Sequence, residues 1–66
     1  MKGEFLINNI ECIWNKPCNI KNGQVVTASF CASSQKFLFG KDLTGRDMWF
    51  DCVDIEEGWV EEYYED

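Results

Sequence analysis

NGQVVTASFCA, residues 22–32, contains a turn signal followed directly by a strand signal. Asn22 and Gly23 both tolerate the positive φ angles that a tight turn between strands requires. From residue 24 onward apolar and polar side chains alternate, with Val26, Ala28 and Phe30 on one side and Thr27 and Ser29 on the other. A period of two that includes β-branched residues is typical of a half-buried β-strand.

Four further β-rich segments lie on either side of this strand, at residues 4–14, 35–40, 47–55 and 59–64. The last one fits a helical face as well as it fits a strand, so we expect either a short strand or a single helical turn there. Turn residues at 42–45 and 56–58 separate the later segments. Five short strands at this spacing predict an all-β fold, a small closed or partly closed barrel that occupies residues 1–66 as one domain.

The length of the chain limits what this domain can contain. A chain of 66 residues buries only about 60% of the surface that it exposes when unfolded. Aromatic residues make up 15% of the sequence, and each can bury roughly 150–250 Å². We therefore expect one compact core without a deep catalytic cavity.

The carboxylates are concentrated at the C-terminal end. Residues 51–66 hold eight of the twelve acidic residues and no Lys or Arg, which gives a formal charge of −8, whereas residues 1–50 total +2 and the whole chain −6. Trp59, Tyr63 and Tyr64 are interleaved with these carboxylates. The eight acidic residues are Asp51, Asp54, Glu56, Glu57, Glu61, Glu62, Glu65 and Asp66. Such a segment predicts a surface that binds a cationic partner.

The residue types argue against catalysis. The chain has no His, so the common general base and metal ligand at neutral pH is missing. A nucleophilic thiol would need a base or a cationic neighbour, and we expect a non-enzymatic protein without a cofactor. No export signal or membrane span is evident, which favours the cytoplasm and free thiols. A zinc site or disulfides made by Cys12, Cys18, Cys31 and Cys52 are the alternatives, although no C-x-x-C motif is present.

Two stretches, IECIWNKPCNIKNGQVVTA (residues 10–28) and FDCVDIEEGWVEEYYE (residues 50–65), carry a resemblance to known proteins. The chain resembles the small SH3-like β-barrel proteins that are common in phage and prophage genomes. Cys12-Ile13 would end the first strand, Gly23 would begin the second, and residues 58–65 would form the acidic, aromatic terminus. This resemblance implies a five-stranded SH3-like barrel and a phage accessory role, without implying a reaction.

The acidic segment leads to a hypothesis about function. Carboxylates at strand spacing on a rigid surface imitate a phosphate backbone, and long-range attraction speeds the encounter with a basic protein. We expect the protein to bind and inhibit a basic host protein in the bacterial cytoplasm, such as a nuclease, a restriction or CRISPR effector, or RNA polymerase. The expected contact residues are Asp51, Asp54, Glu56, Glu57, Trp59, Glu61, Glu62, Tyr63, Tyr64 and Glu65.

Other interpretations stay open. The acidic segment is also typical of a solubilising tail, in which case the binding face lies elsewhere, for example in the loop at residues 15–21. A zinc-binding structural module and an oligomeric structural or virion protein are further alternatives. Direct nucleic-acid binding is disfavoured, because a segment of charge −8 repels phosphates.

Overall fold

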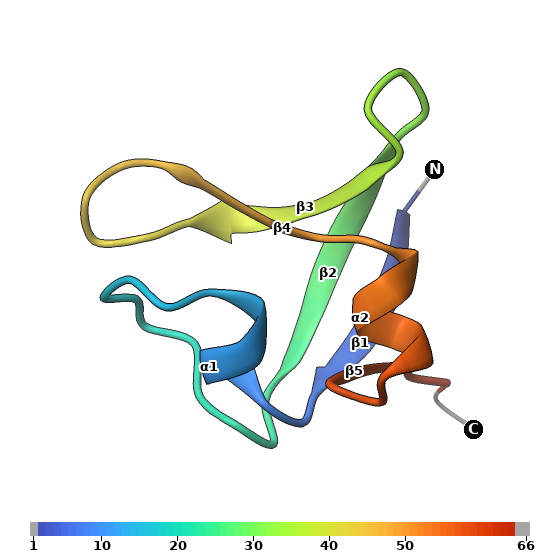
Figure 1. Cartoon of the computed structure of the whole chain (residues 1–66), viewed down its shortest axis with the longest axis horizontal. Helices are drawn as coiled ribbons and strands as arrows, with labels where there is room; N and C mark the ends of the chain where they lie inside the picture. The colour runs from blue at the N-terminus through green and yellow to red at the C-terminus, as the bar shows by residue number, and fades with distance from the viewer. Residues whose placement is uncertain (1, 65–66) are drawn as a thin grey trace.

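The structure is a computed structural model that describes residues 2–64, and it consists of one antiparallel sheet with two short helices (Figure 1). The strands are β1 (Lys2–Ile7), β2 (Val25–Cys31), β3 (Lys36–Lys41), β4 (Asp47–Phe50) and β5 (Val60–Glu62). The helices are α1 (Ile10–Ile13), which follows β1, and α2 (Cys52–Glu56), which separates β4 from β5. The prediction of an all-β fold with five strands is confirmed.

The strand order in the sheet is β4-β3-β2-β1-β5. Four strands form an up-and-down series, and β5 then returns to pair with β1. Figure 1 shows that the sheet is strongly curled, with the β3–β4 hairpin crossing above β1 and β2. Because of this curl, side chains from both edge strands reach the same interior, as expected for a partly closed barrel.

The strand predicted from alternation, β2, lies at the centre of the sheet. Val26 and Ala28 are buried, while Thr27 and Ser29 on the opposite face are exposed. Gly23 has φ of +89° in the turn before β2, a conformation that favours glycine. The local signals of residues 22–32 therefore predict both the turn and the inward face of the strand correctly.

The prediction of one strand over residues 4–14 is wrong in its second half. β1 ends at Ile7 because the backbone amides of Asn8 and Asn9 donate to the carbonyl of Trp59, at 2.8 and 3.1 Å. The Asn9 side chain then caps α1 by accepting from the amide of Cys12 at 3.4 Å. Asn is a favoured residue at this capping position, so the chain turns into a helix where a strand was expected.

The prediction of one strand over residues 47–55 is also wrong in its second half. β4 ends at Phe50, and Asp51 begins α2 through a capping box with Asp54. Met48 and Phe50 point inward, whereas Cys52, the next residue in the alternation, is exposed. Of the two alternatives expected for residues 59–64, a short strand or a single helical turn, the structure has the short strand, at residues 60–62.

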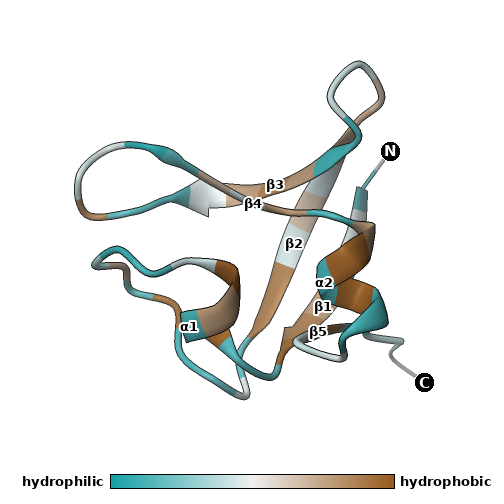
Figure 2. Ribbon diagram, viewed as in Figure 1, coloured by the Kyte–Doolittle hydropathy of each residue, from teal (hydrophilic) through white to brown (hydrophobic). Residues whose placement is uncertain are grey.

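The hydrophobic core fills the inside of the curled sheet. Its buried residues come from all five strands: Phe5, Ile7, Val26, Ala28, Phe39, Met48, Phe50 and Val60. Phe50 is fully buried and contacts the ring of Phe5, with 5.0 Å between ring centroids, and stacks on Phe37 at 5.1 Å. Figure 2 shows the apolar residues running along β1, β2 and β3 and through α2.

Candidate interaction surface

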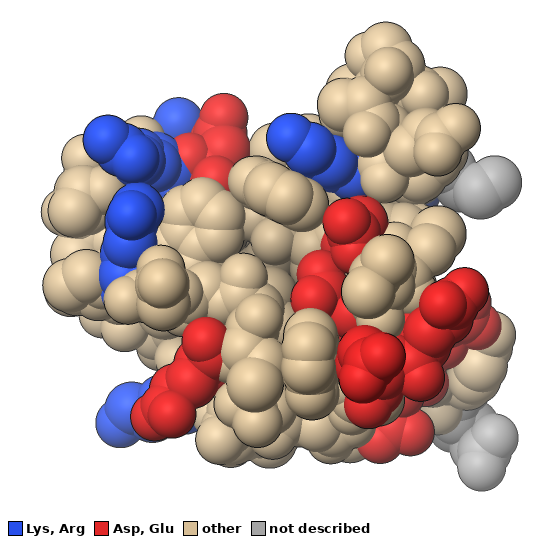
Figure 3. Space-filling view, in the orientation of Figure 1, with Lys and Arg blue, Asp and Glu red and all other residues tan. Residues whose placement is uncertain are grey.

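The acidic residues of the C-terminal segment gather at one end of the molecule, over α2 and β5. In Figure 3 the carboxylates form a nearly continuous cluster there, while Lys and Arg lie mainly at the opposite end. Six of the eight predicted acidic residues fall within residues 2–64; Glu65 and Asp66 lie outside the described part of the chain. The six do not form one uniform face, because the fold assigns them to three different surroundings.

Two of the carboxylates, Asp51 and Asp54, cap α2. The Asp51 side chain accepts from the backbone amides of Val53 and Asp54, at 3.1 and 3.4 Å, and the Asp54 carboxylate accepts from the amide of Asp51 at 3.0 Å. Burial raises the pKa of Asp54, and the hydrogen bond from Asp51 opposes this effect. These two carboxylates are occupied by backbone donors and are therefore poorly placed for a partner.

Three other carboxylates, those of Glu56, Glu57 and Glu61, are exposed near the turn between α2 and β5. Asn8 holds this turn: its side-chain amide donates to the carbonyl of Gly58 at 3.0 Å and to Glu61 Oε1 at 3.1 Å. We call Glu56, Glu57 and Glu61 the outer acidic cluster. Its negative charges lie on an ordered helix and strand that are tied to β1.

The sixth carboxylate, that of Glu62, lies on the opposite face of β5 from Glu61. The register pairs Glu62 with Phe5, which is buried, and Glu61 with Leu6 on the other side of the sheet. Neighbouring residues of a strand point to opposite faces. The hydroxyl of Tyr64 donates to Glu62 Oε2, and this hydrogen bond raises the pKa of Tyr64. Glu62 therefore belongs to a different surface from the outer acidic cluster.

The three aromatic residues predicted as anchors differ in their exposure. Tyr64 is 78% exposed and Tyr63 is 38% exposed. Trp59 is half-buried, and its carbonyl accepts the hydrogen bonds that end β1. Tyr63 and Tyr64 are thus accessible to a partner, whereas Trp59 mainly joins β5 to the rest of the fold.

An apolar groove of about 460 Å³ opens beside Glu62 and Tyr64. Its walls and floor are formed by residues of β1, β2 and β3: Gly3, Phe5, Ala28, Phe30 and Phe37. Glu62 supplies a charged side chain on this face of the sheet; Lys2 and Glu4 of β1 also border the groove, but in the alternation with Gly3 and Phe5 their side chains belong to the opposite face. The residue pattern along the chain does not predict this groove; its one signal is Phe30, a large apolar residue at the end of the inward row of β2, which is 37% exposed in the structure.

Lys16, Lys41 and Arg46 gather around the β3–β4 turn and the loop after α1, whereas Lys36 lies over Trp49 near the start of α2 and Lys2 borders the apolar groove. The amide of Leu43 donates to the carbonyl of Pro17 at 3.0 Å, which brings Lys16 to the same end as Lys41 and Arg46. Lys41 forms an ion pair with Asp47 at 3.0 Å between exposed side chains. The molecule is therefore electrically polar, with its basic end away from the outer acidic cluster (Figure 3).

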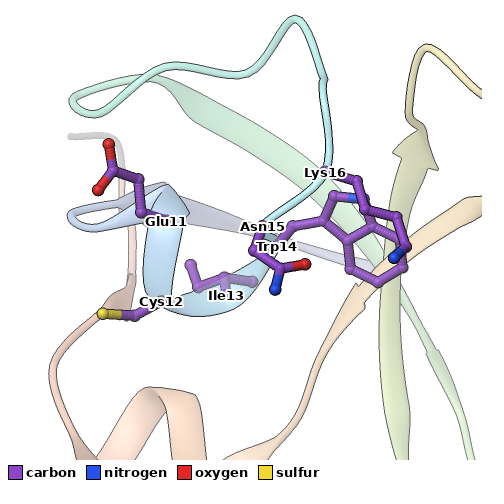
Figure 4. A pocket seen from close by; sticks show the side chains of 6 residues that line it. All are labelled: Glu11, Cys12, Ile13, Trp14, Asn15 and Lys16. Carbon is purple, nitrogen blue, oxygen red and sulfur yellow. The ribbon is translucent and has the colours of Figure 1, made fainter.

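A smaller hollow of about 250 Å³ follows α1 and the loop after it. Figure 4 shows that Glu11 and Cys12 point to the other side of the helix from Trp14. The indole of Trp14 donates to the carboxylate of Asp42 at 2.8 Å, so its polar atom already has a partner. The lining side chains do not converge on a common point, and this hollow shows no arrangement for chemistry.

The four cysteines are free thiols in the structure, and no group of three or more metal-ligating residues occurs within residues 2–64. Cys12 and Cys52 are exposed, and Cys18 and Cys31 are half-buried. Hydrogen bonds with Ser33 and Ser34 lower the pKa of Cys31 to about 7. The four thiols are therefore not gathered at one place within the described part of the chain.

Comparison with known proteins adds no relative to this picture. No protein-family model, curated protein or solved structure matches the chain. Within residues 2–64, neither helix has the length or apolar character needed to cross a membrane. The outer acidic cluster and the apolar groove are therefore the two surfaces that bear on the function of this protein.

Proposed function

We propose that this protein is a non-enzymatic binding protein that captures a basic, nucleic-acid-handling protein through the outer acidic cluster. The partner belongs to the class of nucleases, restriction or CRISPR effectors, or RNA polymerase, and the carboxylates occupy the surface on which that partner holds phosphates. In this proposal the protein acts as a phage-derived inhibitor in the cytoplasm of a bacterial cell.

The observation that carries the proposal is the position of Glu56, Glu57 and Glu61 on ordered elements with no Lys or Arg in residues 51–66. A solubilising tail needs no fixed geometry, whereas in this cluster Asn8, the residue after β1, holds Glu61 and the turn at Gly58 by hydrogen bonds. Charges held in place act on a partner without the entropy loss that ordering a flexible tail requires. The support is therefore the combination of charge and rigidity.

The separation of charge adds an orienting effect. The acidic end attracts a basic surface while the basic end of the molecule is repelled by it, so the protein approaches with α2 and β5 first. Clustered charge of one sign accelerates association by roughly 10–10³-fold. The attraction acts over about 10 Å at 0.1 M salt and about 3 Å at 1 M, so capture must weaken steeply with ionic strength.

The first prediction tests this function directly. Immobilised protein is used to capture proteins from a bacterial lysate at 0.1 M salt, and captured proteins are identified by mass spectrometry. The variant Glu56→Lys/Glu57→Lys should lose capture of nucleic-acid-binding proteins by at least about tenfold, because close like charges at an interface cost several kcal/mol. Purified captured protein should also lose its own binding to DNA or RNA when the wild-type chain is added.

The matched control is Glu11→Lys/Asp47→Lys, which changes the net charge by the same amount at exposed sites away from the cluster. It should retain most of the capture. Equal losses in both variants would reduce the effect to net charge and refute a specific face. Capture that persists unchanged in 1 M salt would equally contradict the proposal.

A further inference from the structure

The apolar groove beside Glu62 is built around a position that has no side chain. Gly3 of β1 pairs with Ala28 of β2, so the two smallest residues of the inner face lie opposite each other. A Cβ atom at Gly3 would lie 3.3 Å from Cε1 of Phe5, closer than an ordinary contact. A larger residue at position 3 would therefore crowd the Phe5 ring and narrow the groove.

The walls of the groove are aromatic and partly open to solvent. Phe30 pairs with Phe37 across β2 and β3, with 4.8 Å between ring centroids, and Phe37 contacts Phe5 at 5.3 Å. Phe30 is 37% exposed and Tyr64 is 78% exposed. Exposed aromatic residues next to a recess are the usual composition of a binding hot spot, and the volume of about 460 Å³ lies within the ~300–1,000 Å³ range of ligand pockets.

The rim determines which apolar group fits. Glu62 provides a carboxylate on the face of Phe5, whereas the side chains of Lys2 and Glu4 alternate to the opposite face of β1, so the charged side chain beside the groove is negative. Glu61 of the outer acidic cluster lies on the other face of the same strand, β5. An acidic ligand would be repelled by the nearby carboxylates, and an uncharged one would not be attracted by them. An apolar side chain with cationic neighbours would make apolar contacts in the groove and would also be attracted by these carboxylates.

We infer that this groove binds a large apolar side chain, aromatic or long aliphatic, that is flanked by Lys or Arg in a segment of the partner protein. The inference rests on the proposed function, since it names the anchor by which the basic partner is held. The outer acidic cluster attracts the partner, and the groove supplies the short-range contact that attraction alone lacks. Specificity for one basic protein among many then comes from the apolar anchor.

The probe is the peptide acetyl-Lys-Lys-Phe-Lys-Lys-amide, added to isotope-labelled protein and followed by NMR. The amides of Gly3, Ala28 and Phe30 should shift, and binding should be at least about tenfold tighter than that of the same peptide with Ser in place of Phe, since burying a Phe side chain gains more free energy than the 1.4 kcal/mol to which tenfold corresponds. A peptide in which Glu replaces the four Lys residues should not bind.

Two variants and one control locate the site. Gly3→Val fills the groove, and Phe30→Ser removes one wall at a partly exposed position that the fold tolerates more easily. Both should abolish the advantage of the Phe peptide over the Ser peptide. Leu43→Ser, at an exposed apolar residue of the β3–β4 turn, should leave it unchanged. An advantage that survives Gly3→Val and Phe30→Ser overturns the inference.

The outcomes separate this inference from the proposed function. If both peptides bind equally and shift only residues of α2 and β5, the groove has no anchor role, while the acidic function stands. If the Phe peptide binds in the groove but Glu56→Lys/Glu57→Lys captures proteins normally, the proposed function fails and the groove remains a site. If the groove amides shift with protein concentration instead of with peptide, a second copy occupies it and the inference is wrong.

Discussion

Asp42 accepts four hydrogen bonds and is the one buried charged residue within residues 2–64. Its Oδ1 atom accepts from the amide and hydroxyl of Thr44, at 2.8 and 2.6 Å, and from the amide of Arg46 at 3.0 Å. Its Oδ2 atom accepts from the indole of Trp14 at 2.8 Å. This single side chain therefore closes the β3–β4 turn and fastens the loop after α1 to it.

Replacing this carboxylate should destabilise the fold without touching either interaction surface. Asp42→Asn puts a donor where the carboxylate accepts, so at least one of the surrounding N–H or O–H groups loses its partner. We expect the melting temperature to fall by at least about 5 °C, as measured by circular dichroism at pH 7. Asp47→Asn, at an exposed carboxylate, is the control and should change it little.

The same position predicts a pH dependence. The hydrogen bond from the Thr44 hydroxyl, together with those from Trp14 and the backbone, holds the pKa of Asp42 well below its usual range. A carboxyl whose pKa is lower in the folded state than in the unfolded state, where it is about 3.9, stabilises the fold above that pH. The difference in stability between wild type and Asp42→Asn should therefore be constant above about pH 5 and shrink progressively below pH 4. A difference that is the same at pH 3 and pH 7 would contradict this assignment.

At the scale of elements, α2 determines the shape of the acidic segment and the positions of its carboxylates. It interrupts what the sequence alone presents as one strand from residue 47 to residue 55, and it turns the chain so that β5 can reach β1. Gly58, with φ of +82°, ends this reversal. Without α2 the carboxylates would continue along an extended strand, and the compact cluster over the α2–β5 turn would not form.

The cap of this helix should matter for stability and not for binding. Asp51→Ala removes the acceptor of the amides of Val53 and Asp54, and such a loss costs about 0.5–2 kcal/mol. Asp51→Asn keeps an acceptor of nearly equal quality and should cost much less, although it removes the same charge. Urea unfolding would give both values, and partner capture should be retained by Asp51→Asn. A loss of capture in Asp51→Asn would show that this carboxylate contacts the partner, contrary to its place in the cap.

At the scale of the whole molecule, the distribution of charge opposes folding. The net charge is −6, and the last turn of α2 has no basic residue while Glu56 and Glu57 lie at its C-terminal end. Negative charge at that end of a helix is unfavourable, and accumulated like charge destabilises a compact state. A surface that lowers stability in this way is easier to understand as one retained for binding.

This cost leads to a prediction about stability. Glu56→Lys/Glu57→Lys should melt at the same temperature as wild type or a few degrees higher at about 0.01 M salt, where charges interact over about 30 Å. The gain should disappear at 1 M salt. Thermal melts at the two salt concentrations would measure it, and a variant that melts clearly below wild type at low salt would show that these carboxylates support the fold.

The sequence by itself determined β2, the turn at Asn22-Gly23, an all-β fold with five strands and the uneven distribution of charge. These features follow from neighbours along the chain, because alternation, turn residues and charge are local properties. The sequence predicted that the carboxylates of residues 51–66 form one face, and the structure instead divides them among different surroundings. The order of acidic residues along the chain does not reveal which of them share a face.

Only the tertiary structure decided where β1 and β4 end, how the carboxylates are divided, and that a groove exists. Asn8 and Asn9 leave the strand because their amides reach the carbonyl of Trp59, fifty positions away. Glu61 and Glu62 are separated by the pairing of β5 with β1, and the groove lies where Gly3 of β1 and Ala28 of β2 are opposite each other. In each case the physical cause is a contact between segments distant in the chain, which no local pattern of residues encodes.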